Sequence, residues 1–133
     1  MAVAGLAHVA IRCRDLNASA RFYSKVLGLR VGERPPFGFD GRWLYAKNGA
    51  AIVHLFGAGD EAARCFTGSV ADQGAGAIDH VAFAATNWPA VRARFNDLGI
   101  AFQPRQAPDT GAAQVFLRDP DGVTIELNFE GPL

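Results

Sequence analysis

Three histidines and one glutamate occupy matched positions in the two halves of the chain. His8 and His80 lie in the stretches LAHVAI (6–11) and IDHVAF (78–83), at an offset of 72 residues (80 − 8). The same offset carries IVHL (52–55) onto TIEL (124–127), which matches His54 with Glu126. Imidazoles and carboxylates are common ligands of divalent metal ions. The chain has three histidines in all, and the pattern predicts one metal centre formed by His8, His54, His80 and Glu126.

The segments between these positions predict the same elements in each half. Each half has an apolar helical pattern that starts at capping residues and ends at a glycine, Asp15 or Asn17 to Gly28 and Thr86 or Asn87 to Gly99. Three strand-like runs separated by turn residues follow each helix, at 29–34, 42–47 and 50–56, and at 100–105, 113–118 and 123–129. The module is therefore β-α-β-β-β, and the chain contains it twice.

These modules predict an α+β protein with a single domain over residues 1–133. Module one covers about 5–56, a Gly- and Ala-rich connector covers 57–77, and module two covers about 78–129. Alternate residues of a strand point to opposite faces of its sheet, so the four candidate ligands share the face that the helices do not cover. We expect the paired modules to form a curved, cup-like mixed sheet with the helices outside.

Composition and charge limit the classes of partner. Half of the residues are hydrophobic, and thirteen Lys and Arg balance thirteen Asp and Glu, so the formal net charge is zero. A neutral chain without a basic cluster does not predict nucleic-acid binding. The longest apolar runs are far shorter than the roughly 20 residues of a membrane helix, and the N-terminus does not resemble a signal peptide. We expect a cytoplasmic protein with a small-molecule ligand and no membrane partner.

These features together resemble the vicinal oxygen chelate superfamily, which includes glyoxalase I, extradiol dioxygenases and the fosfomycin and bleomycin resistance proteins. The resemblance covers about residues 5–129 and includes Phe22-Tyr23, Leu27-Gly28-Leu29 and the ending DPDGVTIEL (119–127). It implies one divalent cation on the strands of the four candidate ligands, with Zn, Ni, Fe and Mn all open. It also implies a substrate bound through adjacent oxygens, and a homodimer.

The glyoxalase I members offer the first functional hypothesis, a metal-dependent lyase or isomerase. Similarity to them implies that Glu126 removes a proton next to a carbonyl while the metal stabilises the enediolate. The alternative is that Glu126 acts only as a metal ligand. Arg12 stands where those enzymes bind glutathione with an arginine. His54 and Ala58 replace a glutamate and an asparagine of those enzymes, so glutathione specificity stays open.

Two further members of the superfamily offer alternatives. An extradiol dioxygenase would use His8, His80 and Glu126 as a facial triad on iron, with His54 as an acid or base, but Phe116 replaces its catalytic tyrosine. Resistance proteins of the fosfomycin or bleomycin type remain a third hypothesis, the latter being binding proteins without metal ligands. Trp43 and Phe116, with Arg12, are our candidates for substrate contact.

Overall fold

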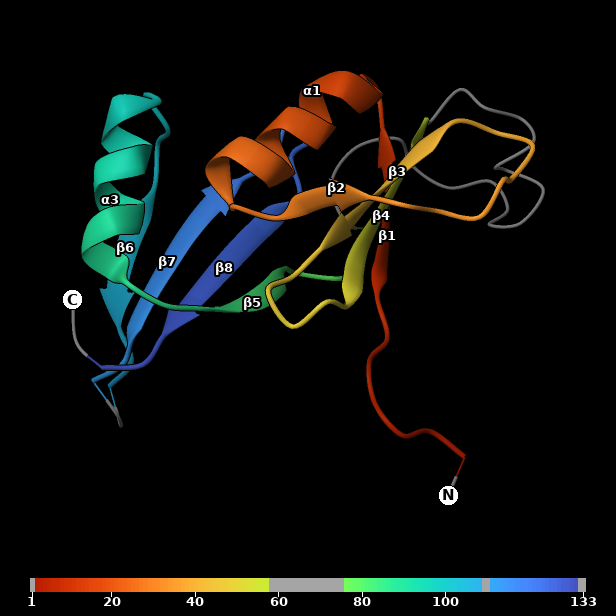
Figure 1. Cartoon of the computed structure of the whole chain (residues 1–133). Coiled ribbons are helices and arrows are strands. Elements are labelled where there is room, and N and C mark those ends of the chain that lie inside the picture. Colours follow the sequence, from red (N-terminus) through yellow and green to blue (C-terminus); the bar gives the residue numbers. More distant parts are fainter. Residues whose placement is uncertain (1, 58–75, 109–110, 132–133) are drawn as a thin grey trace. The chain divides into compact units, whose positions relative to one another are not determined.

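The chain divides into two compact units, one from Met1 to Asp72 and the other from Gln73 to Leu133. The computed structural model describes residues 2–57, 76–108 and 111–131. The division falls within the predicted connector, of which 58–75 lie outside the described residues, as does the predicted turn at 109–110. Each unit has the predicted order β-α-β-β-β (Figure 1). The α+β class and the duplicated module are therefore confirmed, whereas the single domain stays a prediction.

Unit 1 is a four-stranded mixed sheet with the strand order β1-β4-β3-β2. Its strands are β1 (Val9–Cys13), β2 (Arg30–Gly32), β3 (Gly41–Tyr45) and β4 (Ala51–Gly57). β1 runs parallel to β4, with Ala10 opposite His54, and β3 runs antiparallel to β4, with Trp43 opposite His54. His54 therefore lies on a central strand, with a neighbouring strand on each side.

Unit 2 repeats this topology with the strand order β5-β8-β7-β6. Its strands are β5 (Val81–Ala85), β6 (Gln103–Gln106), β7 (Ala113–Arg118) and β8 (Thr124–Phe129). β5 runs parallel to β8 and places Ala82 opposite Glu126, while antiparallel β7 places Phe116 opposite Glu126. Glu126 thus occupies the position in unit 2 that His54 occupies in unit 1.

The helices bury one face of each sheet. Helix α1 (Leu16–Arg21) starts at Asp15, whose side chain accepts from the amide of Ala18, and packs against β3 and β4. It continues as the π-helical turn η1 (Phe22–Val26). Helix α3 (Trp88–Asp97) starts at Asn87, whose side chain accepts from the amide of Ala90.

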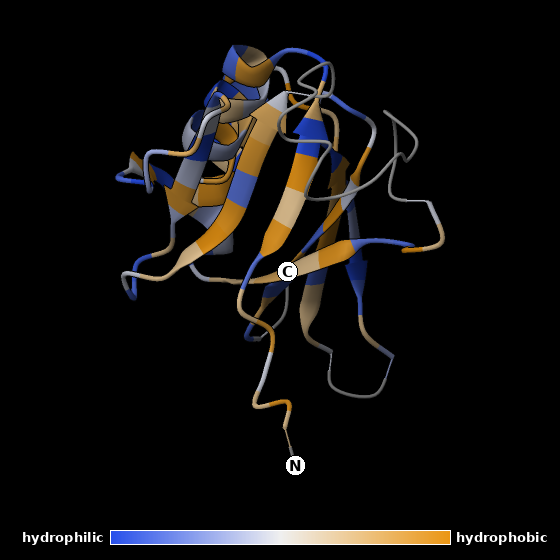
Figure 2. Ribbon diagram, turned by 90° about the vertical axis from the view of Figure 1, so that its right-hand side faces the viewer, coloured by the Kyte–Doolittle hydropathy of each residue, from blue (hydrophilic) through white to orange (hydrophobic). Residues whose placement is uncertain are grey.

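The core of each unit follows the alternation of its strands. Val53 and Leu55 are buried on either side of the half-buried His54, and Ile125 and Leu127 are buried on either side of Glu126. Figure 2 shows apolar and polar bands alternating along the strands. Burial of this apolar stripe against the helices fixes the strand register, because a slip of one residue would expose it.

Strand boundaries are where the predictions need correction. We predicted His8 and His80 inside strands, but β1 and β5 begin one residue later, at Val9 and Val81. Regular pairing with the neighbouring strand starts only at those valines, so each histidine lies where the chain enters the sheet.

No helix in the described part of the chain is long and apolar enough to cross a membrane.

Candidate functional site

In unit 1, three aromatic rings form a stack on the face of the sheet opposite α1. The rings of His8 and His54 have centroids 3.8 Å apart and an angle of 16° between their planes. Trp43 stacks on His54 at 3.9 Å and 7°. This stack results from the register, because Trp43 and Ala10, two residues after His8, both lie opposite His54. Both unit 1 candidates for metal ligation are therefore in direct contact.

His54 has a defined tautomer. Its Nε2 lies 3.1 Å from the carbonyl oxygen of Ala51, and a carbonyl only accepts, so Nε2 carries the hydrogen and Nδ1 keeps its lone pair. Burial lowers the pKa of His54 below its ordinary value, and the charges of His8 and Arg34 lower it further. A neutral imidazole with a free lone pair is the form that binds a metal ion.

A cavity of about 530 Å³ adjoins this stack. Its lining includes the three stacked rings together with Arg34, Phe37 and Phe39. Ligand pockets of drug size have volumes of roughly 300–1,000 Å³ and largely apolar walls with a few polar groups. The cavity of unit 1 therefore has the size and the surface of a small-molecule site.

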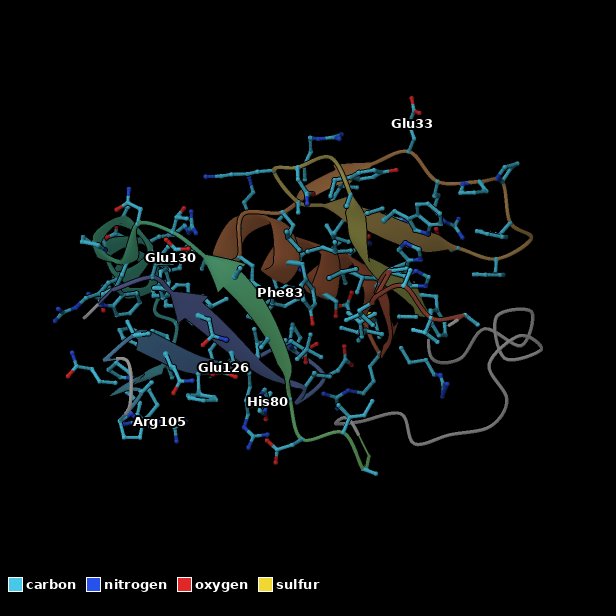
Figure 3. The ribbon with its side chains drawn as sticks, turned by 90° about the horizontal axis from the view of Figure 1, so that it is seen from below. Glu33, His80, Phe83, Arg105, Glu126 and Glu130 are labelled. Atoms are coloured by element: carbon cyan, nitrogen blue, oxygen red, sulfur yellow. The ribbon has the colours of Figure 1, made fainter. Side chains whose placement is uncertain are left out.

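In unit 2, His80 and Glu126 form an ion pair. Nε2 of His80 lies 2.8 Å from Oε2 of Glu126, and Nδ1 lies 2.7 Å from Oδ1 of Asp79 (Figure 3). Ionised carboxylates only accept, so both ring nitrogens donate when the ring is protonated, and a metal ion at His80 would replace the proton on Nε2. The hydrogen bond that His80 donates to Asp79 is the largest influence and raises the pKa of His80; burial opposes it, and the charge of Glu126 raises the pKa further.

The other oxygen of Glu126 is held by a chain of hydrogen bonds across the sheet. Nε2 of Gln114 donates to Oε1 of Glu126 at 2.8 Å, and Nε and Nη2 of Arg105 donate to Oε1 of Gln114 at 3.1 and 2.9 Å. Arginine has donors only and an ionised carboxylate has acceptors only, so the Gln114 amide has one permitted orientation. Glu126 is 5% exposed and is thus fixed from both sides.

The predicted substrate residues lie in different units. Trp43 is part of the unit 1 stack and lines the cavity. Arg12 lies on β1 with its guanidinium 5.7 Å above the ring of Phe56. Phe116 lies in unit 2, where its ring meets that of His80 edge to face at 6.0 Å. Ala58 lies outside the described residues. Substrate contact by these side chains stays a prediction.

The four predicted ligands are brought together as two pairs. His8 and His54 meet within unit 1, and His80 and Glu126 meet within unit 2. No group of three or more His, Cys, Asp or Glu side chains that could hold a metal ion is found among residues 2–57, 76–108 and 111–131. The donor chemistry fits a divalent metal nonetheless, because histidine ligands of metals commonly donate their second nitrogen to a carboxylate, as His80 does to Asp79.

Sequence reasoning missed Asp79, Gln114 and Arg105 in unit 2 and Arg34 in unit 1. Gln114 lies two residues before Phe116, so strand parity was a usable signal that it shares the face of Glu126. Arg34 follows β2 in a segment without regular structure, where no periodicity indicates the direction of a side chain.

Comparison with known proteins identifies the family and agrees with the fold. The family model described as the Glyoxalase/Bleomycin resistance protein/Dioxygenase superfamily matches residues 5–127. Glyoxylase I 4 from Arabidopsis thaliana is 30% identical over 125 residues, which cover 92% of this chain and 68% of the relative. Lactoylglutathione lyase from Pseudomonas aeruginosa is 27% identical over 144 residues, which cover 90% and 79%. A genomically encoded fosfomycin resistance protein from Listeria monocytogenes has the same fold, with a TM-score of 0.68 at 16% identity over 96% of this chain and 93% of that one.

Proposed function

Because the chain belongs to the Glyoxalase/Bleomycin resistance protein/Dioxygenase superfamily, we propose that it is a metal-dependent lyase or isomerase of the glyoxalase type. The substrate is a small molecule that carries oxygens on adjacent carbons. His8, His54, His80 and Glu126 hold one divalent metal ion, and Glu126 also acts as the base.

The pair formed by His80 and Glu126 is the observation that carries this proposal. Its nitrogen and oxygen lie 2.8 Å apart, a separation that two ligands of one ion share in compact coordination. Asp79 accepts a hydrogen bond from Nδ1 of His80, and Gln114 donates one to Oε1 of Glu126. Each member of the pair is therefore oriented by a second partner. A charged pair held by second partners on both sides is typical of a site that is preorganised for a ligand.

The chemistry follows from what each residue offers. A divalent ion at these ligands would supply Lewis-acid stabilisation of negative charge on the adjacent oxygens of the substrate. Glu126 accepts the proton from the carbon next to the carbonyl, and its carboxylate is positioned for this by Gln114 on Oε1 and by His80 on Oε2. The same carboxyl group returns the proton to the neighbouring carbon, which completes an isomerisation.

The ring-cleaving alternative is less well supported by unit 2. The ring of Phe116 lies 6.0 Å from that of His80 in a T-shaped arrangement, and it has no hydroxyl group that could donate a proton. The relatives named glyoxylase I and lactoylglutathione lyase favour the lyase. A homodimer and a cytoplasmic location stay predictions.

The experiment that tests the proposal is the metal content of protein purified without chelator. We expect close to one divalent ion per chain in the wild type and a large loss in His80→Ala and Glu126→Gln. Glu33→Gln, the same chemical change at an exposed position, serves as the matched control and keeps the metal.

Reconstituted protein is then assayed on a hemithioacetal and on a catechol. Turnover of the hemithioacetal that is lost in Glu126→Gln supports the lyase, whereas turnover of the catechol alone would replace it with the dioxygenase. A wild type that binds no divalent ion even after reconstitution would contradict the proposal and leave a binding protein.

A further inference from the structure

The cavity of unit 1 has a single kind of charge on its wall. Among the described residues that line it, Arg34 is the permanently charged one, and none is acidic. Its remaining wall is formed largely by aromatic rings, alanines and Leu55. An apolar pocket with one cation selects its ligand by shape and by negative charge.

Arg34 is held in place by its surroundings. Its guanidinium lies 5.3 Å from the ring centre of Phe37 and 5.4 Å from that of Phe39, and Nη1 donates to the carbonyl of Phe39 at 3.1 Å. Phe37 and Phe39 stack on each other at 5.4 Å and 11°. The planar cation and the two rings therefore form one contacting cluster beside the cavity.

This cation still has hydrogen-bonding capacity. The Nε–H of Arg34 is buried and has no acceptor among the residues that the structure describes. A buried donor without an acceptor is costly, and an oxygen that reaches it recovers that cost. The nearby Asp40 directs Oδ1 at Arg42 (2.6 Å) and at the amide of Gly41 (2.9 Å), and it interacts with Arg34 through its charge without accepting a hydrogen bond from Nε.

We propose that the unit 1 cavity binds an aromatic carboxylate, with the ring against the aromatic wall and the carboxylate on Arg34. A guanidinium matches a carboxylate in geometry and holds it by charge-assisted hydrogen bonds. Phe37, Phe39 and Trp43 supply faces and edges for the ring of the ligand. The identification of this ligand with the substrate rests on the proposed lyase function, but the binding itself needs no metal ion.

The test uses three probes of one shape on metal-free protein. 3-Phenylpropionate is the anion, 3-phenylpropanamide is neutral, and 3-phenylpropylamine is the cation. Isothermal titration should show that the anion binds at least about tenfold more tightly than the amide, since hydrogen bonds to charged groups are worth that much or more. The amine should bind most weakly.

Variants then assign the preference to Arg34. Arg34→Met should bring the anion down to the affinity of the amide, and Arg34→Lys, which keeps the charge without the planar fork, should retain part of the preference. Arg30→Met, on β2 and outside the lining of the cavity, is the matched control and should leave the preference unchanged. Any of three results would overturn the inference. The wild type could bind the anion and the amide equally, it could bind none of the probes, or Arg34→Met could keep the preference for the anion.

These outcomes are separable from the proposed function. Bound metal without anion preference would leave the lyase standing and refute the aromatic carboxylate. A preference for the anion in a protein that binds no metal would support the aromatic carboxylate and refute the lyase.

Discussion

The substitution Gln114→Met tests whether the hydrogen-bond chain of unit 2 holds Glu126. It replaces the amide by an apolar group of similar length and removes the donor that lies 2.8 Å from Oε1 of Glu126. Glu126 keeps its contact with His80 on Oε2. The effect therefore isolates one side of the carboxylate.

The expected magnitude follows from burial. Glu126 is 5% exposed, so water cannot easily replace the lost donor, and a hydrogen bond to a charged group contributes about 1.5–3 kcal/mol. Arg105 is exposed and regains its hydrogen bonds from water at little cost. We expect the free energy of unfolding of metal-free protein to fall by about 1.5–3 kcal/mol.

Urea denaturation measures this change, and Gln103→Met, on an exposed position of β6, is the matched control. A double-mutant cycle with Glu126→Gln should give a coupling energy of about 1 kcal/mol or more, as contacting residues do. If Gln114→Met is no more destabilising than Gln103→Met, or if the cycle shows no coupling, the reasoning about this chain is refuted.

Four further outcomes are expected of metal-free protein. Asp79→Asn should lower the pKa of His80 toward its ordinary value of 6.5, because the carboxylate of Asp79 is the main cause of its rise; an unchanged NMR titration would contradict this. The raised pKa also means that the ion pairs of His80 stabilise the fold fully below pH 6.5 and that this contribution is lost as the pH rises through the raised value. His8→Ala should raise the pKa of His54, since it admits water to the ring and removes a like charge. An unchanged pKa of His54 in an NMR titration would contradict the contact between the two rings. Phe95→Ala should cost about 3–5 kcal/mol in urea denaturation, because the ring is 0% exposed, and a loss below about 1 kcal/mol would show that the site refills.

Much of the fold was predictable because local signals and the repeat agree. Capping side chains at Asp15 and Asn87 started the helices, and Gly28 and Gly99 ended them in the left-handed conformation, with φ of 76° and 66°. The entry of each sheet was placed too early, at His8 and His80, because hydrophobic alternation continues past the end of the hydrogen-bonded ladder.

The site was predictable only where parity decides the direction of a side chain. Parity placed His54 and Glu126 on the face away from the helices, as the structure does. It gave no reason to distinguish Gln114 from any solvated polar residue, because its role depends on the partners across β6 and β8. Arg34 depends on the course of a loop, which no local pattern encodes.

The π-helical turn η1 accounts for a difference in length between the two modules. The helices begin in frame, at Leu16 and Trp88, but the terminating glycine follows after 12 residues in the first module and after 11 in the second (28 − 16 and 99 − 88). A π turn accommodates one additional residue within a helix, and the frame is restored by β3 and β7, which begin at Gly41 and Ala113. An insertion was thus absorbed on the helical layer without moving the strands of His54 and Glu126. The helices of the two copies are therefore free to diverge in length while the strands that carry the candidate ligands keep a common frame.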